Sequence, residues 1–381
     1  MRGDYMKIIG IHAEGLPLFK NELNIGFTVT QRVSDDDKGS LIQLFNNIYL
    51  NPTEAIIGIN ASGKTSVLKV VLLVLGLLNN EPINHLGVKD ILGKSEEVAI
   101  STVFFSNDSL YKLKTKISFK DDRYIITDEV LMRKSVNDVK SRKTMLEFDD
   151  SMIMTTRKQD EEFLSDDVSI VIAHNKKNKE HMLVEDMLSF TNINVLPISD
   201  EIPLSIISFL DPTVKELSFE RQNGKELIHL VFKGQDEIVL NNARELENYL
   251  SSGTIKGIIT FSKAMEVLRL GGYMVIDEVE NHFNKEIVAT LIRFFMDNKL
   301  NKNGAVLVFS THYPELLDEY DRNDSIYITR NRDGIELKRL TEVLSRNDIK
   351  RSEAYQSGLL DGTTPAYEAY MQLKKSIAAY V

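Results

Sequence analysis

A glycine-rich octapeptide at residues 58–65 limits the folds open to this chain. It reads GINASGKT, matches the pattern G-x-x-x-x-G-K-[ST], and directly follows the apolar run Ala55–Ile57. A strand that delivers the chain to such a loop, followed by a helix over residues 66–78, lets successive backbone N–H groups and the positive helix end surround a polyphosphate. The sequence therefore predicts a P-loop nucleotide-binding protein.

The loop assigns separate tasks to its side chains. Lys64 is expected to neutralise the β- and γ-phosphates of ATP, and the Thr65 hydroxyl to hold Mg²⁺. The other residues expected to bind the nucleotide here are Gly58, Asn60, Ala61, Ser62, Gly63 and Ser66.

Composition excludes several classes of protein. The 43% apolar and 27% charged fractions of the 381 residues are those of an ordinary globular protein. The chain has no cysteine, which rules out disulfides and thiolate metal sites, and the net charge of −10 argues against a globally basic nucleic-acid binder. The longest apolar run, Val67–Leu78, is too short to span a bilayer. We expect a cytoplasmic protein without a membrane partner.

A second set of residues lies far downstream. The apolar run Tyr273–Ile276 ends in Asp277 and Glu278. In P-loop enzymes an aspartate at such a strand end helps to hold Mg²⁺, and a following glutamate can accept a proton from the attacking water. Taken alone, the pair is equally compatible with an ordinary acidic turn.

Two further features flank this strand. Ser251, Ser252 and Gly253 begin a predicted helix that continues through Leu270, and short hydroxyl side chains at a helix start can bind an anion. His312 follows the apolar run 305–309 and can hydrogen-bond a γ-phosphate. By themselves, these features are better explained as an ordinary capped helix start and a loop histidine without a role.

The order of these pieces resembles the ABC-type ATPase superfamily of P-loop proteins, with Walker A loop, signature, Walker B strand and switch histidine. Within it the sequence is similar to the soluble SMC-like ATPases of the overcoming-lysogenization-defect and abortive-infection type. The pieces that carry the resemblance are IHAEGLPLFKNELNIGF, GINASGKT, LSSGT, MVIDEVENHF and FSTHYPELLD. The resemblance as a whole covers most of the chain except about residues 130–210.

The resemblance implies that two chains close head-to-tail around ATP and Mg²⁺. Ser251 and Gly253 would reach the nucleotide of the partner chain, Asp277 would serve Mg²⁺, and Glu278 would be the catalytic base. His312 would be the switch residue, and Asn281 and His282 would lie in the dimer-contact loop. The implied function is an ATPase switch that gates a separate effector, a nuclease or a toxin, in anti-phage defence. A larger homo-oligomer and a nucleic-acid ligand stay open.

The sequence also departs from the family pattern. Ser252 stands where transporters have glycine, and no clear glutamine completes the Mg²⁺ site, for which His174 and Asn175 are the candidates. One alternative function is a DNA-repair or chromosome-handling ATPase that binds DNA through Lys112, Lys114 and Lys116. Others are a transporter nucleotide-binding subunit and a protein that binds ATP without hydrolysing it.

Three regions are expected along the chain. Residues 1–130 would hold the Walker A loop and an antiparallel β lobe, and residues 131–210 an inserted, mainly helical lobe. Residues 211–381 would hold the signature, Walker B and the switch histidine. Helices are predicted at Glu180–Phe190 and Ile202–Leu210, and a C-terminal helix at Pro365–Ala379 whose apolar stripe is expected to pack in the core, or else to dock a partner.

Overall fold

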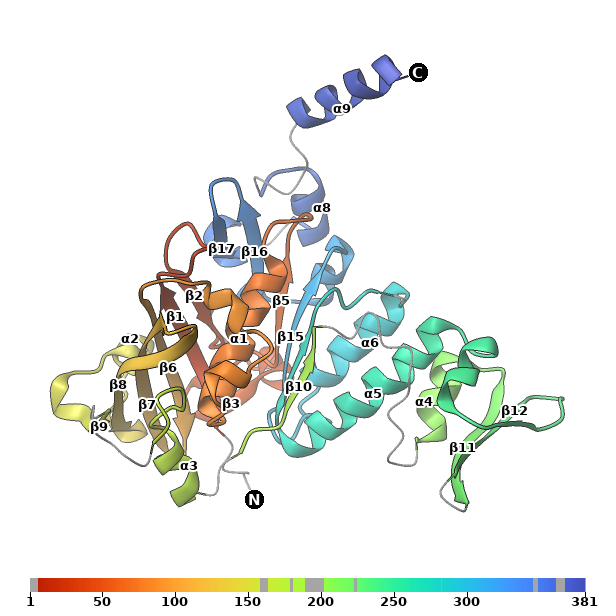
Figure 1. Cartoon of the computed structure of the whole chain (residues 1–381), viewed down its shortest axis with the longest axis horizontal. Helices are drawn as coiled ribbons and strands as arrows, with labels where there is room; N and C mark the ends of the chain where they lie inside the picture. The colour runs from red at the N-terminus through yellow and green to blue at the C-terminus, as the bar shows by residue number, and fades with distance from the viewer. Residues whose placement is uncertain are drawn as a thin grey trace.

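The computed structural model describes residues 6–157, 164–178, 181–188, 202–222, 225–281, 283–344, 349–360 and 367–380. Two six-stranded sheets dominate the molecule, and helix α1 lies between them (Figure 1). One sheet is mixed and the other is antiparallel, which confirms the predicted P-loop α/β fold with an antiparallel β lobe.

The mixed sheet has the strand order β10-β14-β15-β5-β16-β17. The first five strands run parallel, and β17 returns antiparallel to β16. Helices cover both faces, so the central strands are buried and read as continuous apolar runs. The strands are β5 (Thr53–Ile57), β10 (Val184–Met187), β14 (Tyr273–Ile276), β15 (Val306–Thr311), β16 (Ile326–Asn331) and β17 (Ile335–Arg339).

The antiparallel sheet has the order β2-β1-β6-β7-β8-β9. Along β7, the buried residues Tyr111, Leu113 and Ile117 alternate with lysines on the other face, as the sequence predicts. The strands are β1 (Lys7–Glu14), β2 (Leu23–Gly26), β6 (Val98–Ser106), β7 (Ser109–Lys120), β8 (Arg123–Ser135) and β9 (Ile153–Thr156). A separate hairpin, β3 (Ile42–Phe45) and β4 (Ile48–Leu50), lies before β5.

Helices fill the space on either face of the mixed sheet. Helix α1 (Lys64–Leu78) has buried apolar residues on all sides, because both sheets pack against it. Helices α5 (Ser252–Leu270) and α6 (Lys285–Met296) cover the opposite face and share a second apolar core with β14 and β15. The phosphate loop is therefore fixed between a buried strand and a buried helix. No helix among the described residues combines the length and apolar character needed to cross a membrane.

The described part of residues 131–210 contains both helices and strands. The helices are α2 (Arg142–Leu146), α3 (Ile172–Asn178) and α4 (Leu204–Leu210), and the last of these confirms one predicted helix. The helix predicted at 180–190 is wrong for residues 184–187, which form β10 and pair in parallel with β14. Local sequence favoured a helix there, but pairing with the buried neighbouring strand decides the outcome.

A three-stranded sheet, β11-β12-β13, lies beside α4. Its strands are β11 (Val214–Gln222), β12 (Lys225–Phe232) and β13 (Ile238–Leu240). In the sequence, Asn223 and Gly224 between the runs Glu216–Arg221 and Glu226–Phe232 predict a hairpin. The antiparallel pairing of β11 with β12 confirms it, whereas the turn itself lies outside the described residues.

The C-terminal elements are α7 (Leu340–Val343), α8 (Arg351–Gln356) and α9 (Tyr367–Tyr380). Helix α9 matches a predicted helix, but its apolar stripe does not pack in the core. Tyr370, Leu373 and Ile377 are 56%, 61% and 55% exposed, and Figure 1 shows α9 standing away from both sheets. An amphipathic stripe specifies that a helix needs an apolar partner, but not which one.

Candidate nucleotide site

The loop at residues 58–65 joins β5 to α1 and has the backbone shape that its sequence predicts. Gly63 has φ of 100° and Ala61 has φ of 61°, in the left-handed region. A Cβ atom at Gly58 would lie 2.2 Å from Thr329 Oγ1 and 2.3 Å from Ser62 Oγ. Glycine is thus required at position 58 because neighbouring side chains occupy the space. Helix α1 begins at Lys64, so its N-terminal N–H groups face the loop.

Strand β16 supports the loop from the side. The hydroxyls of Ser62 and Thr329 are 2.7 Å apart, and the Asn331 side-chain amide donates to Ala61 O at 3.0 Å. These contacts hold the loop in place through side chains and one carbonyl oxygen, without using its backbone N–H groups. Sequence reasoning missed Thr329 and Asn331, because only strand pairing brings them next to the loop.

The Lys64 ammonium lies at the centre of the site. Its Nζ donates to Gly58 O at 3.0 Å and to Ile59 O at 3.3 Å, and it lies 3.4 Å from His312 Nδ1. Burial lowers the pKa of Lys64, while the charges of Asp277, Glu278 and Glu280 act in the opposite direction. In this structure Lys64 Nζ is paired only with neutral carbonyl oxygens of the loop and with His312. A bound triphosphate would give it an anionic partner.

Asp277 connects the loop to the two neighbouring strands. The Thr65 hydroxyl donates to Asp277 Oδ2 at 2.6 Å, and the Ser310 hydroxyl donates to Asp277 Oδ1. Ser310 Oγ also accepts from the backbone N–H of Glu278 at 2.7 Å. Ser310 therefore contacts both acids. In the sequence, only its position two residues before His312 connects it with the site.

Glu278 and His312 face each other across the site. Glu278 Oε1 lies 3.5 Å from His312 Nε2, and Asn281 donates to Glu278 Oε2 at 2.8 Å. Glu280 Oε1 accepts from the backbone N–H of His312 at 2.6 Å. Glu278 has φ of 46°, an uncommon backbone conformation that recurs at functional sites.

Sheet topology explains why these residues meet. Strand β15 lies between β5 and β14, and all three run in parallel. The phosphate loop, the acid pair and His312 each follow the carboxyl end of one of these strands, the edge at which α/β sheets bind ligands. The structure thus brings together Lys64, Thr65, Asp277, Glu278 and His312, as predicted from the sequence.

A cavity of about 300 Å³ opens at this edge. Its lining includes Leu18, residues 60–66, Glu278, His312, Asn331 and Ile335. Ser251, Ser252 and Gly253 are not among the described residues that line it. They form the start of α5, where Ser251 Oγ accepts from Thr254 N at 3.0 Å, and both serines are exposed. The two serines of the predicted signature are therefore exposed, and Gly253 is half-buried.

The oxygen atoms around Asp277 fit a magnesium ion. Thr65 Oγ1 and the Asp277 carboxylate lie 2.6 Å apart at the loop, and Mg²⁺ prefers such hard oxygen ligands. Thr65 and Asp277 would hold the ion.

The candidates for the glutamine position are wrong. Asn175 is buried and donates to Leu78 O and Asn80 Oδ1, at the end of α1 far from the loop. His174 packs against Tyr111 with ring centroids 4.5 Å apart. Helix α3 carries both residues and packs against the C-terminal end of α1, whereas the phosphate loop lies at the N-terminal end. Neither residue can therefore reach the Mg²⁺ site. His282 lies outside the described residues.

Comparison with known proteins identifies the family. Residues 55–318, more than half of the chain, match the family described as "AAA domain, putative AbiEii toxin, Type IV TA system". Among curated proteins no sequence matches.

Two solved structures of the recombination mediator protein RecF in the RecFOR pathway are distantly similar. The RecF-ATP structure has a TM-score of 0.40 and 10% identity, and the RecF-ATPrS structure a TM-score of 0.37 and 13% identity. Each comparison covers 88% of this chain and 98% of the other. On the evidence of the match over residues 55–318, this chain is a member of the AAA-domain family named above.

Proposed function

We propose that this protein is an ATP-hydrolysing switch that closes as a dimer around ATP and gates a partner effector. The observation that carries the proposal is the division of the predicted site. The Walker residues surround one cavity, whereas Ser251 and Ser252 are exposed and lie outside its lining. If the Walker residues and the signature serines contact the same nucleotide, the signature serines must come from another chain.

Hydrolysis would use the residues at the edge of the mixed sheet. Water would attack the γ-phosphorus, its proton would pass to Glu278, and ADP would leave with the bond between the β-γ bridging oxygen and the γ-phosphorus broken. Lys64 would stabilise the charge that develops on the phosphoryl oxygens. Ser310 would orient Asp277 and Glu278, and His312 would lie next to both Lys64 and Glu278. Bound Mg²⁺ would supply further charge neutralisation between the β- and γ-phosphates.

ATP would control closure because the partner's Ser251 and Gly253 contact the nucleotide only in the closed dimer. A ligand shifts a conformational equilibrium by its difference in affinity for the two states, and this contact supplies that difference. The description of the family names a type IV TA system, which supports a partner protein for this chain, while the defence role rests on the sequence resemblance. A homodimer is the smallest assembly in which a second chain can bring its signature residues to the nucleotide, and a larger ring could do so as well.

Mass in solution tests the proposal directly. Light scattering after gel filtration is expected to show a monomer or open assembly without nucleotide and a dimer with a non-hydrolysable ATP analogue. A solitary chain at saturating analogue would contradict the proposal.

A second candidate function is DNA handling. Lys112, Lys114 and Lys116 lie on one face of β7, and Lys114 is exposed there. Lys116, however, pairs with Glu97 at 3.0 Å, which reduces the charge available to phosphates. This candidate predicts duplex DNA affinity that falls steeply with salt and weakens in Lys114→Ala. If the protein does not bind duplex DNA even at low salt, this candidate function is excluded.

A further inference from the structure

A second cavity lies at the opposite end of the strands that carry the nucleotide site. Its volume is about 580 Å³, within the range of small-molecule sites. Gly304, on its wall, precedes β15, and Lys7 reaches from the start of β1 to donate to Gly271 O just before β14. His312 and the acid pair follow the other ends of these two strands. The two cavities are therefore distinct sites.

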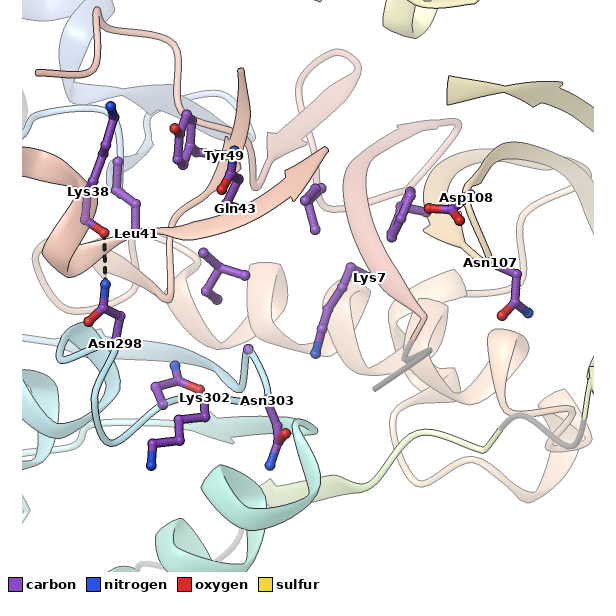
Figure 2. A pocket seen from close by; sticks show the side chains of 15 residues that line it. Lys7, Lys38, Leu41, Gln43, Tyr49, Asn107, Asp108, Asn298, Lys302 and Asn303 are labelled. Atoms are coloured by element: carbon purple, nitrogen blue, oxygen red, sulfur yellow. Dashed lines mark hydrogen bonds between the residues drawn. The ribbon is translucent and has the colours of Figure 1, made fainter. Parts of the chain in front are cut away.

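Three parts of the chain build this cavity, and Figure 2 shows their side chains. They are the beginning of β1 with the β6–β7 turn, the β3–β4 hairpin with the turn before it, and the loop between α6 and β15. The lining residues used below are Lys7, Lys38, Tyr49, Phe105, Asp108 and Lys302.

Lys7 gives the cavity a buried positive group. The residue is 4% exposed, and Figure 2 shows its side chain near the middle of the cavity with Nζ directed towards the loop of Lys302 and Asn303. Gly304 packs close to this side chain, because a Cβ atom there would lie 3.4 Å from Lys7 Cε and 3.7 Å from Lys7 Nζ. A buried ammonium is costly, and burial lowers the pKa of Lys7 to about 7. An anion in the cavity would offset that cost.

The other charged residues that line the cavity also favour an anionic ligand. Lys302 is exposed on the facing loop, while Lys38 pairs with Asp35 at 2.6 Å and contributes its stem to the wall. Asp108 is the one carboxylate among the described lining residues. Tyr49 and Phe105 add aromatic surface beside the polar groups, a combination typical of sites for small organic ligands.

We propose that this cavity binds a small molecule bearing a phosphate group, held between the ammonium groups of Lys7 and Lys302. The phosphate dianion matches two cations, and the aromatic walls accommodate an organic part. The lining comes from the antiparallel sheet, the β3–β4 hairpin and the loop ahead of β15, so the ligand would contact all three.

Inorganic phosphate is the probe, and broadening of its phosphorus NMR signal is the readout. Because the nucleotide loop also binds phosphate, the measurement uses the full chain carrying Lys64→Met, with wild type alongside. We expect binding to persist in Lys64→Met and to weaken by about tenfold or more on adding Lys7→Met or Lys302→Met, since each change removes a charge-assisted hydrogen bond.

Lys299→Met is the matched control, because Lys299 is exposed on the same loop but does not line the cavity. It should leave phosphate binding unchanged. Circular dichroism checks the fold of Lys7→Met, and Lys302→Met tests the site independently of any buried change. Three results would each overturn the proposal: no binding to the Lys64→Met chain, binding unaffected by both cavity variants, or equal loss in Lys299→Met. None of them depends on whether the protein hydrolyses ATP.

Discussion

The Thr65 hydroxyl donates to Asp277 Oδ2 at 2.6 Å across a sequence separation of 212 residues. This contact joins the phosphate loop to the end of β14 and places the two predicted magnesium ligands side by side. Ser310 holds the other oxygen of the same carboxylate.

Asp277→Asn should lower the maximal ATP turnover by about a hundredfold or more, because the amide is a poor magnesium ligand and charge neutralisation at the phosphates is worth several kcal/mol. Steady-state phosphate release over a magnesium titration measures this. Asp236→Asn, at an exposed turn, is the control. Turnover within a factor of two of wild type would remove Asp277 from the metal site.

Glu278→Gln should slow phosphate release by about 10²–10⁴-fold, the range for loss of a general base, while ATP still binds. The ATP-bound dimer should then accumulate, which light scattering detects. Glu286→Gln, an exposed change on α6, should behave as wild type. If phosphate release continues in Glu278→Gln, another group accepts the proton.

Gly58→Ala should weaken ATP binding by about tenfold or more. The new Cβ atom would meet Thr329 Oγ1 at 2.2 Å and the Thr329 backbone oxygen at 2.8 Å, and overpacking of this kind costs about 1–3 kcal/mol. A fluorescent ATP analogue measures the affinity. Gly87→Ala, where nothing lies within 4 Å of the added atom, is the control. Unchanged affinity in Gly58→Ala would show that β16 does not fix the loop.

Lys7 should make folding stability depend on pH. Burial lowers its pKa from 10.5 to about 7 in the folded chain, so between these values the unfolded chain binds more protons and stability rises with pH. The contribution of this one residue approaches about 1.4 kcal/mol per pH unit in that window. The free energy of unfolding of wild type and Lys7→Met is measured with urea from pH 7 to pH 10 and plotted against pH. The difference between the slopes of the two plots gives the contribution of Lys7. Parallel slopes would contradict a lowered pKa of Lys7 in the folded chain.

The sequence predicts the parts of this fold that local chemistry determines. The phosphate loop with its flanking strand and helix carries its own signal, and so does strand β7, in which apolar residues alternate with lysines. The order of motifs likewise indicates that Lys64, Asp277, Glu278 and His312 share one site, because each follows a buried strand of an α/β sheet.

What the sequence leaves open depends on contacts between distant segments. The local sequence of β10 predicts a helix, but pairing with β14 makes it a strand. Asn175 is a candidate site residue in the sequence, but α3 packs at the end of α1 that lies away from the phosphate loop. Thr329 and Asn331 support the phosphate loop only because β16 pairs with β5. The register of such pairing is set by the whole sheet and not by the strand alone. The catalytic and signature roles themselves stay predictions.

Mixing two inactive variants tests the shared nucleotide site most directly. Lys64→Met disables the phosphate loop, and Gly253→Glu places a carboxylate where the α5 helix start would meet the partner's triphosphate, while an acidic residue in the first turn favours the helix. Each variant alone should be inactive. In a mixed dimer, one site pairs an intact loop with an intact helix start, so an equal mixture should recover about a quarter of wild-type ATP turnover. A mixture as inactive as its components would show that each chain encloses its nucleotide alone.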